Sequence, residues 1–368
     1  MKIEHIELVR FELPLVRPFR TSFGTQNHRD VILVRVATAD ADGWGECVVG
    51  VDPFYNEEYT DAAYEVLVRW LIPMVFAHGP LTAEDFAGVV SNVVGNKGAK
   101  AAFEMALLDA QLRADGVSLT SYLGGTRSSV PVGVSIGITP TVDDLVAVSQ
   151  GYVADGYTRL KLKIEPGFDV EPVRRVREAV GEEVMVQVDA NAAYSEADID
   201  HLAQLDEFNL LLIEQPFEPD DLLTHAAMAK RVSTPVCLDE SIVSLGATRT
   251  ALELAACSVV NVKVGRVGGL IASRDIHDLC AAHGVPVWCG GMLETGVGRA
   301  ANVALASLPN FTLPGDISAS ARYFNRDITE PWVLQGSALA VPTAPGLGVS
   351  VDEEFVASLG ATRELFRP

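Results

Sequence analysis

The chain has 368 residues, of which 48% are hydrophobic and 21% charged, as is typical of a folded globular protein with a large core in one big domain or two. Its formal net charge is −21 and its isoelectric point is near 4.7, which argues against binding to nucleic acid or to an anionic membrane, because both would repel it. A small-molecule ligand is therefore the expected partner.

The amino terminus and the cysteines predict where the protein resides. Residues 1–6 include the acidic Glu4 where a signal peptide would have an apolar run, and the chain has no apolar run of about 18 residues. We therefore expect a cytoplasmic protein. The cysteines are five in number, scattered, and without a Cys-x-x-Cys pair, which favours reduced core thiols over disulfides or zinc ligation.

The first fifty residues alternate as strands do, over 4–13, 31–37 and 43–48, and predict an antiparallel sheet. Two loops with aromatic residues are expected at 17–25 and 50–55. Exposed aromatics on these loops would suit a lid, although local packing of Phe19 and Phe54 is an equally good interpretation. From 57 to 115 the apolar period becomes helical, so the region is α+β.

After residue 125, short apolar runs alternate with amphipathic helices such as 170–180, 196–205 and 273–283, which predicts repeated βα units around a parallel sheet. The candidate strands number eight: 132–138, 159–164, 184–189, 210–214, 236–239, 259–263, 285–289 and 311–313. The fold class is therefore α/β, a modified TIM barrel of the (β/α)7β type with an α+β capping domain. The expected divisions are 1–125 for the cap, 126–322 for the barrel, and 323–368 for a tail that returns to cover the open edge of the cap sheet.

Two lysines occupy one face of the candidate strand at 159–164. Because side chains alternate along a strand, Lys161 and Lys163 point one way while the apolar residues between them point the other. Burial and mutual repulsion of two ammonium groups would favour the neutral, basic form of a lysine. For the pair alone, a position at the strand end in contact with solvent would explain the pattern as well.

Five candidate strands end in a charged residue, at intervals of 24 to 26 residues: Lys163, Asp189, Glu214, Asp239 and Lys263. The carboxyl ends of barrel strands form the active-site face, so these side chains should converge at one mouth. The alternative for the three acids is to cap the following helices. Those helices already have candidate caps: Ser195, Asp220 or Asp221, and Ser244.

Three neighbouring carboxylates without a capping role would repel one another unless a cation neutralised them, and all-oxygen ligation favours Mg²⁺ or Mn²⁺ over zinc. We therefore predict a divalent-metal site that could also receive a substrate carboxylate and stabilise an enediolate. Lys163 and Lys263 would face such a substrate from opposite sides, and Lys161 can stay charged and assist the carboxylate.

This pattern of strand-end lysines and carboxylates resembles that of the enolase superfamily, and within it the muconate-lactonising subgroup, which has Lys-x-Lys on strand two and a lysine on strand six. Four segments look like the o-succinylbenzoate synthase and N-acylamino acid racemase family: Pro-Phe-Arg-Thr-Ser-Phe-Gly at 18–24, Ile-Glu-Pro-Gly at 164–167, Val-Lys-Val-Gly-Arg-Val-Gly-Gly at 262–269, and Trp-Cys-Gly-Gly-Met-Leu-Glu-Thr-Gly at 288–296. The resemblance implies a homo-oligomer, metal ligation by the three carboxylates, and acid/base roles for Lys163 and Lys263. It also implies substrate contacts by Ser135, Asn191, Gly290, Gly291 and Met292, and by the cap loops with Phe19, Phe23 and Phe54.

Two features narrow the reaction. Mandelate-racemase-like members use a histidine on strand seven, which is absent from 285–291 here. Arg266 looks like the arginine of the racemase-capable branch, where it would tune the basicity of Lys263, although it could instead bond a neighbouring acid at a helix start.

The favoured interpretation is racemisation of N-succinylamino acids by two lysines. The alternative is o-succinylbenzoate synthesis in menaquinone biosynthesis, in which Lys163 alone acts as base while Lys263 stays cationic. A dipeptide epimerase or a cycloisomerase would use the same barrel with different cap loops. A non-catalytic barrel is disfavoured, since all five charged strand ends are present.

Overall fold

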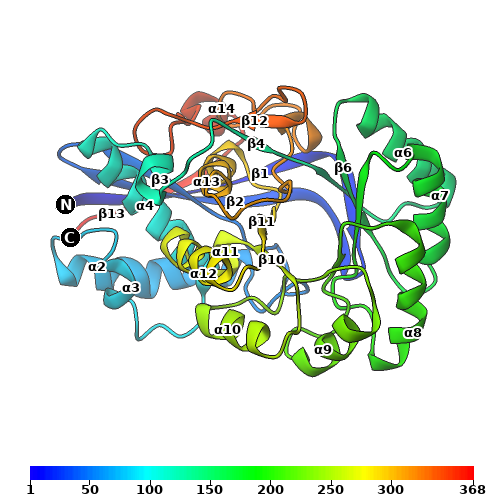
Figure 1. The fold of residues 1–368 in the computed structure, drawn as a ribbon. Coiled ribbons are helices and arrows are strands. Elements are labelled where there is room, and N and C mark those ends of the chain that lie inside the picture. The colour runs from blue at the N-terminus through cyan, green and yellow to red at the C-terminus, as the bar shows by residue number, and fades with distance from the viewer.

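The computed structural model describes residues 1–368 and contains a parallel, curled sheet beside a smaller antiparallel sheet with its own helices (Figure 1). The strands of the parallel sheet are ordered β11-β10-β9-β8-β7-β6-β5, so each lies next to its sequence neighbour, as in a TIM barrel. Their bounds are β5 Val134–Ile136, β6 Arg159–Lys163, β7 Met185–Asp189, β8 Ile213–Glu214, β9 Val236–Leu238, β10 Val259–Val262 and β11 Val287–Cys289.

The eighth position of the ring is filled by an irregular segment, residues 310–316, and not by a regular strand. On one side the backbone N–H of Thr312 donates to Val287 (3.2 Å), and on the other the N–H of Gly133 donates to Gly315 (2.8 Å). The expected strand at 311–313 is therefore wrong as a regular strand, because the segment makes only isolated bridges to its neighbours. It nevertheless closes the ring.

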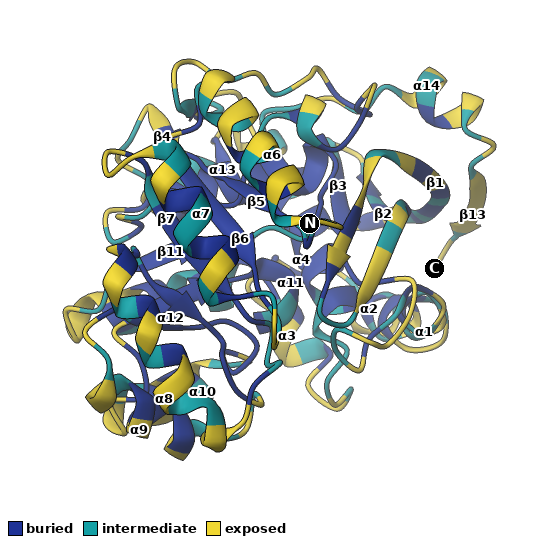
Figure 2. Ribbon diagram, turned by 90° about the vertical axis from the view of Figure 1, so that its right-hand side faces the viewer, coloured by how far each residue is buried: buried dark blue, intermediate teal, exposed yellow.

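Helices follow the strands and cover the outside of the barrel. Figure 2 shows buried strands inside and helices whose outward faces are exposed. The helices are α6 Val142–Ala154, α7 Val170–Val180, α8 Ile199–Leu202, α9 Leu222–Arg231, α10 Leu245–Glu253, α11 Val264–Val267, α12 Leu270–Ala282 and α13 Gly296–Ala306. The helical stretch predicted at 196–205 is present but irregular: α8 is a single turn between 3₁₀ turns at Glu196–Asp198 and Ala203–Phe208.

The antiparallel sheet has the order β13-β1-β2-β3. Its strands are β1 Ile3–Thr21, β2 Gly24–Thr38, β3 Asp42–Cys47 and β13 Thr362–Phe366. The loop predicted at 17–25 is wrong, since β1 and β2 continue as one long hairpin in which Phe19 pairs with Gln26 and Thr21 with Gly24. The alternation of apolar residues ends near residue 13, but the backbone pairing of β1 with β2 resumes after an irregularity between Pro14 and Phe19 and continues to the turn.

The cap helices are α1 Thr60–Val66, α2 Ile72–His78, α3 Phe86–Val89, α4 Lys97–Asp115 and α5 Leu119–Leu123, with a π-helical turn at Leu67–Leu71. The helix α4 is buried over most of its surface. Glycines at 43 and 45 allow its close approach to β3, because a Cβ on Gly43 or Gly45 would collide with the backbone of Ala106 or Ala102. The cap sheet is therefore built around a buried helix.

The carboxyl-terminal tail touches both bodies. Its strand β13 pairs antiparallel with β1 and covers the edge that would otherwise be open. Its strand β12, Ala338–Ala340, pairs with β4, Ser129–Pro131, beside the barrel, and α14 spans Glu353–Ser358. All five cysteines are buried and free of disulfides. None of the helices combines the length and the apolar character that crossing a bilayer would require.

Two cap carboxylates fasten the cap to the barrel by accepting hydrogen bonds from helix amino termini. Glu104 of α4 accepts from the N–H groups of Leu270 and Ile271 at the start of α12. Glu46 of β3 accepts from Thr295 (2.9 Å) and Gly298 (2.8 Å) at the start of α13. Unpaired N–H groups at a helix start suit a carboxylate, so each contact serves helix and interface together.

Burial raises the pKa of Glu104 to about 7, which predicts pH-dependent stability. The ordinary pKa of about 4.3 applies in the unfolded chain, so the unfolded state has lost most of this proton by pH 5 while the folded state keeps it up to about pH 7. Folding is therefore weakened as the pH rises from 5 to 8. Relative to Glu104→Gln, the free energy of unfolding of the wild type should fall by up to about 3 kcal/mol over this window, measured by urea unfolding. The exposed Glu207→Gln serves as the control, and a wild-type difference that stays flat with pH would contradict the prediction.

Candidate active site

The barrel brings three buried carboxylates together at the carboxyl ends of its strands. Asp189 ends β7, Glu214 ends β8 and Asp239 follows β9, and the first two are directly paired across the sheet. Each is at most 1% exposed, and one carboxylate oxygen from each lies within 4.8 Å of the others. None of them caps a helix, since Ser195, Asp221 and Ser244 take those positions.

The chemistry of this triad suits a hard divalent cation. Burial, followed by the neighbouring charge of Asp189, raises the pKa of Glu214 well above its ordinary value, as expected for a carboxyl group buried beside another carboxylate. Three oxygen donors at this spacing match the ligand preference of ions such as Mg²⁺ and lack the nitrogen or sulfur that zinc favours. Asp189, Glu214 and Asp239 could therefore hold such an ion.

One end of the triad is bounded by the two lysines of β6, both buried. Lys163 donates to Asp189 (2.5 Å) and to the Oδ1 atom of Asn191 (2.6 Å). Lys161 lies 3.0 Å from a carboxylate oxygen of Asp189 and of Glu214. Burial alone would lower the pKa of Lys161, but Asp316, Glu214 and Asp189 raise it well above its ordinary value, so it is a cation. The solvent-reaching interpretation of the lysine pair is excluded.

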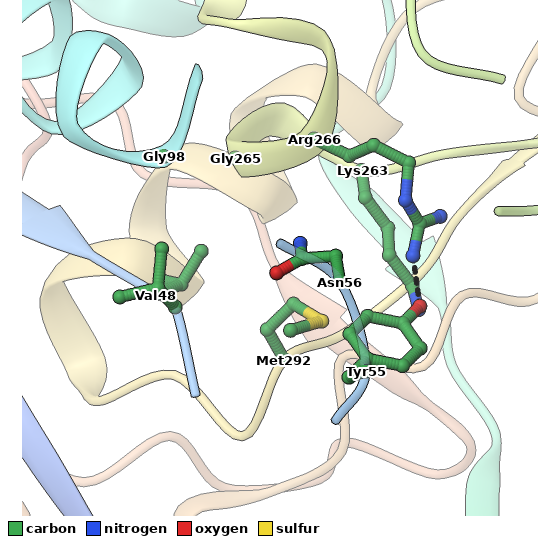
Figure 3. A pocket seen from close by; sticks show the side chains of 9 residues that line it. Val48, Tyr55, Asn56, Gly98, Lys263, Gly265, Arg266 and Met292 are labelled. Carbon is green, nitrogen blue, oxygen red and sulfur yellow. Dashed lines mark hydrogen bonds between the residues drawn. The ribbon is translucent and has the colours of Figure 1, made fainter. Parts of the chain in front are cut away.

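The other end is bounded by Lys263, which follows β10. Its Nζ donates to Asp239 (2.8 Å) and to the hydroxyl of Tyr55 (2.6 Å), and Arg266 bonds the same two partners. Figure 3 shows Tyr55 with its hydroxyl directed at Lys263 and Arg266. Although burial opposes it, Arg266 and Lys263 lower the pKa of Asp239. Arg266 thus binds a neighbouring acid and shares both of its partners, Asp239 and Tyr55, with Lys263.

The remaining barrel residues predicted for substrate contact lie around this cluster. Ser135 is level with Lys161 in the sheet, and its buried Oγ has no hydrogen-bond partner. Asn191 connects Lys163 to Glu240, to which its Nδ2 donates (2.8 Å).

The segment Gly290 to Met292 adjoins the opposite lysine. A Cβ on Gly290 would lie 2.7 Å from the Cε of Lys263, and one on Gly291 would strike the backbone of Asp316. Met292 lines a small cavity together with Lys263 and Tyr55 (Figure 3). Larger residues at either glycine would push into the site.

The three predicted cap aromatics divide into two groups. Phe19 is buried and packs edge to face on Tyr323, with ring centroids 6.5 Å apart. Phe23 packs on Tyr55 at 5.1 Å, and it shares with Phe54 the lining of a cavity of about 140 Å³ between the tip of the β1–β2 hairpin and the loop at 50–55. Phe54 is 69% exposed. The structure therefore brings Phe23 to the cluster through Tyr55, and leaves Phe54 at the surface.

Comparison with known proteins agrees with this architecture over nearly the whole chain. Residues 5–124 match the family described as "Mandelate racemase / muconate lactonizing enzyme, N-terminal domain", and residues 144–355 match the family "Enolase C-terminal domain-like". The chain belongs to the enolase superfamily.

Particular relatives within the enolase superfamily are similar from end to end. The chain is 57% identical to an N-succinylamino acid racemase of Amycolatopsis sp, over 97% of each chain. It is 47% identical to an o-succinylbenzoate synthase of Geobacillus kaustophilus, over 100% of this chain and 98% of the relative. A solved enolase-superfamily structure from Listeria innocua superimposes with a TM-score of 0.95 at 37% identity, covering 100% of this chain and 99% of that one.

Four residues of this enolase-superfamily site escaped the sequence analysis: Tyr55, Gln215, Asn261 and Asp316. Asn261 donates to Glu214 (2.7 Å), and the side-chain oxygen of Gln215 accepts from the N–H of Asp239 (2.9 Å). Alternation could have revealed Asn261, which is two residues before Lys263 on β10. Tyr55 gave no comparable signal, because its position depends on how the cap docks.

The triad predicts that a divalent cation stabilises the fold. With free Mg²⁺ at about 100 times its dissociation constant, binding to the folded state alone should add about 2.7 kcal/mol and raise the midpoint of thermal unfolding. Asp239→Asn should lose most of this gain, whereas the exposed Asp220→Asn should keep it. Equal stabilisation of wild type and Asp239→Asn would place the ion elsewhere.

Proposed function

We propose that the protein racemises N-acylamino acids, and N-succinylamino acids in particular, by moving the proton next to the substrate carboxylate. The observation that carries this proposal is the pair of buried lysines at opposite ends of the carboxylate triad. Lys163 is on β6 and Lys263 follows β10, with three strands between them, so they approach a molecule at the mouth from two sides. Relatives named N-succinylamino acid racemase support the choice of substrate.

The proposed chemistry needs one base and one acid. A neutral lysine takes the α-proton on its Nζ, the C–H bond breaks, and its electron pair moves toward the carboxylate. The ammonium of the other lysine then donates a proton to the opposite face of the carbon, which inverts the centre. Mg²⁺ held by Asp189, Glu214 and Asp239 would supply charge stabilisation for the carboxylate. The charged Lys161 adds to that stabilisation, and Arg266 with Tyr55 orients Lys263.

The second candidate is o-succinylbenzoate synthase, which would serve menaquinone biosynthesis. It is favoured by the 47% identity to a relative of that name and by the same buried residues, which suit a dehydration that begins with the same proton abstraction. In that reaction Lys263 would stay cationic and Lys163 alone would act as base. Both activities in one site are compatible with the arrangement. The cytoplasmic location and the homo-oligomer stay predictions.

The test is proton NMR in D₂O with Mg²⁺ and N-succinyl-L-phenylalanine, together with polarimetry. We expect the α-proton signal to disappear and the optical rotation to fall to zero. Lys163→Ala and Lys263→Ala should each slow racemisation by about a hundredfold or more, because acid–base catalysis contributes at least that factor. The exposed Lys230→Ala is the control. Persistence of the signal and of rotation with several acylated amino acids would reject the racemase, and the cyclohexadiene precursor of o-succinylbenzoate would be tested next.

Tyr55→Phe tests the contact between the cap and Lys263. The hydroxyl accepts hydrogen bonds from two cations, each typically worth about 1.5–3 kcal/mol, so kcat/KM should fall about tenfold or more. Tyr64→Phe removes a comparable hydroxyl that bonds Glu364 on the cap surface, and should leave kcat/KM unchanged. Equal losses in the two variants would show that the effect is not local to Lys263.

A further inference from the structure

The inner face of β6 carries three cations in a row, and the proposed reaction uses only two of them. Arg159, Lys161 and Lys163 are 0%, 2% and 7% exposed. Alternate residues of a strand are roughly 6.6 Å apart, so buried like charges at this spacing repel strongly. The carboxylate triad lies at the Lys163 end of this row. Some other anion must therefore compensate the charge at the Arg159 end.

That anion is Asp316, which follows the irregular eighth segment of the ring. Its Oδ1 accepts from Arg159 (2.5 Å), and its Oδ2 lies 2.6 Å from the Nζ of Lys161. Its backbone N–H donates to Cys289 on β11 (2.9 Å), which fixes the residue to the neighbouring strand. Asp316 is 5% exposed, so it bridges Arg159 and Lys161 within the core.

The surroundings hold this bridge rigidly. Arg159 also donates to the carbonyl of Pro314 (2.7 Å), and the ring of Trp288 lies 5.4 Å from Arg159 and 4.9 Å from Lys161. The absence of a side chain at Gly133 makes room for the guanidinium, since a Cβ there would collide with it. The carboxylate of Asp316 therefore presents one oxygen to Lys161 from a fixed position.

Lys161 has competing partners on its other side. Its Nζ is 3.0 Å from Asp189 Oδ2 and 3.0 Å from Glu214 Oε2, and thus lies farther from these two carboxylates of the triad than from Asp316 (2.6 Å). An ammonium group centred on those oxygens would repel the ion and occupy its ligands. Without Asp316, these two carboxylates would be the only acidic partners left to Lys161.

We propose that Asp316 is a positioning residue of the metal site: it competes with Asp189 and Glu214 for the Lys161 ammonium, so that a divalent cation can take the oxygens of these two carboxylates from Lys161 at lower cost. The inference rests on the proposed function, because it assumes that the triad binds an ion. When the ion binds, Asp316 remains as the acidic partner of the Lys161 ammonium.

The test is a titration of the full-length, metal-free protein with Mn²⁺, in which the free ion is measured by electron paramagnetic resonance. Asp316→Asn should raise the dissociation constant about tenfold or more, a usual effect of losing a partner next to metal ligands. The same substitution in a Lys161→Met background should have no such effect, because the competing ammonium is gone. Thermal unfolding of each variant is measured alongside.

A second variant covers the case in which Asp316→Asn leaves Arg159 unpaired and fails to fold. Arg159→Met combined with Asp316→Asn removes both charges of the buried pair, which is often tolerated, and still frees Lys161. It too should weaken Mn²⁺ binding only when Lys161 is present. Weakening that is equal in both backgrounds, or no weakening with Lys161 present, would overturn the inference.

The two levels of failure are separable. If the wild type binds no Mn²⁺, the proposed metal site fails and the role of Asp316 fails with it. If the wild type binds Mn²⁺ and Glu214→Gln abolishes binding, but affinity is independent of Asp316, the metal site stands and only the positioning role is lost.

Discussion

Compensation of buried charge at the barrel mouth is the constraint on which the rest of the structure depends. Three carboxylates that are almost fully buried face Lys161 and Lys163 at one end and Lys263 and Arg266 at the other. A buried ion left without a partner is strongly destabilising, so neither set could be kept without the other. The same balance leaves the carboxylates poised to exchange some ammonium contacts for a divalent cation.

The cap shares in this balance. Tyr55 reaches Lys263 and Arg266 from a cap loop, and the cap is anchored by Glu46 and Glu104 at the starts of α13 and α12. The helix α13 follows the segment that includes Gly290 and Met292, so the Glu46 anchor also holds one wall of the site. Docking of the cap therefore places the hydroxyl of Tyr55 that bonds Lys263 and Arg266.

Prediction succeeded where the signal was local and periodic. The strand-end charges recur every 24 to 26 residues because one βα unit has about that length, and parallel strands bring equivalent ends to one edge. It failed where backbone pairing overrides side-chain pattern, as in the hairpin through Phe19, and where a segment closes the ring by isolated bridges, as at 310–316. The solvent position considered for the lysine pair was wrong because neighbouring carboxylates satisfy both charges inside the barrel.

By itself, the sequence determined the α/β barrel with its cap, the three carboxylates and the two lysines that face each other across them, since periodicity and spacing are properties of the chain alone. Only the tertiary structure decided which buried charged and polar groups pair. Those contacts join residues that are far apart in the sequence, such as Lys161 with Asp316 and Tyr55 with Lys263. Such pairings depend on ring closure and on cap docking. Neither leaves a periodic trace in the sequence, and both set the electrostatic field in which the lysines act.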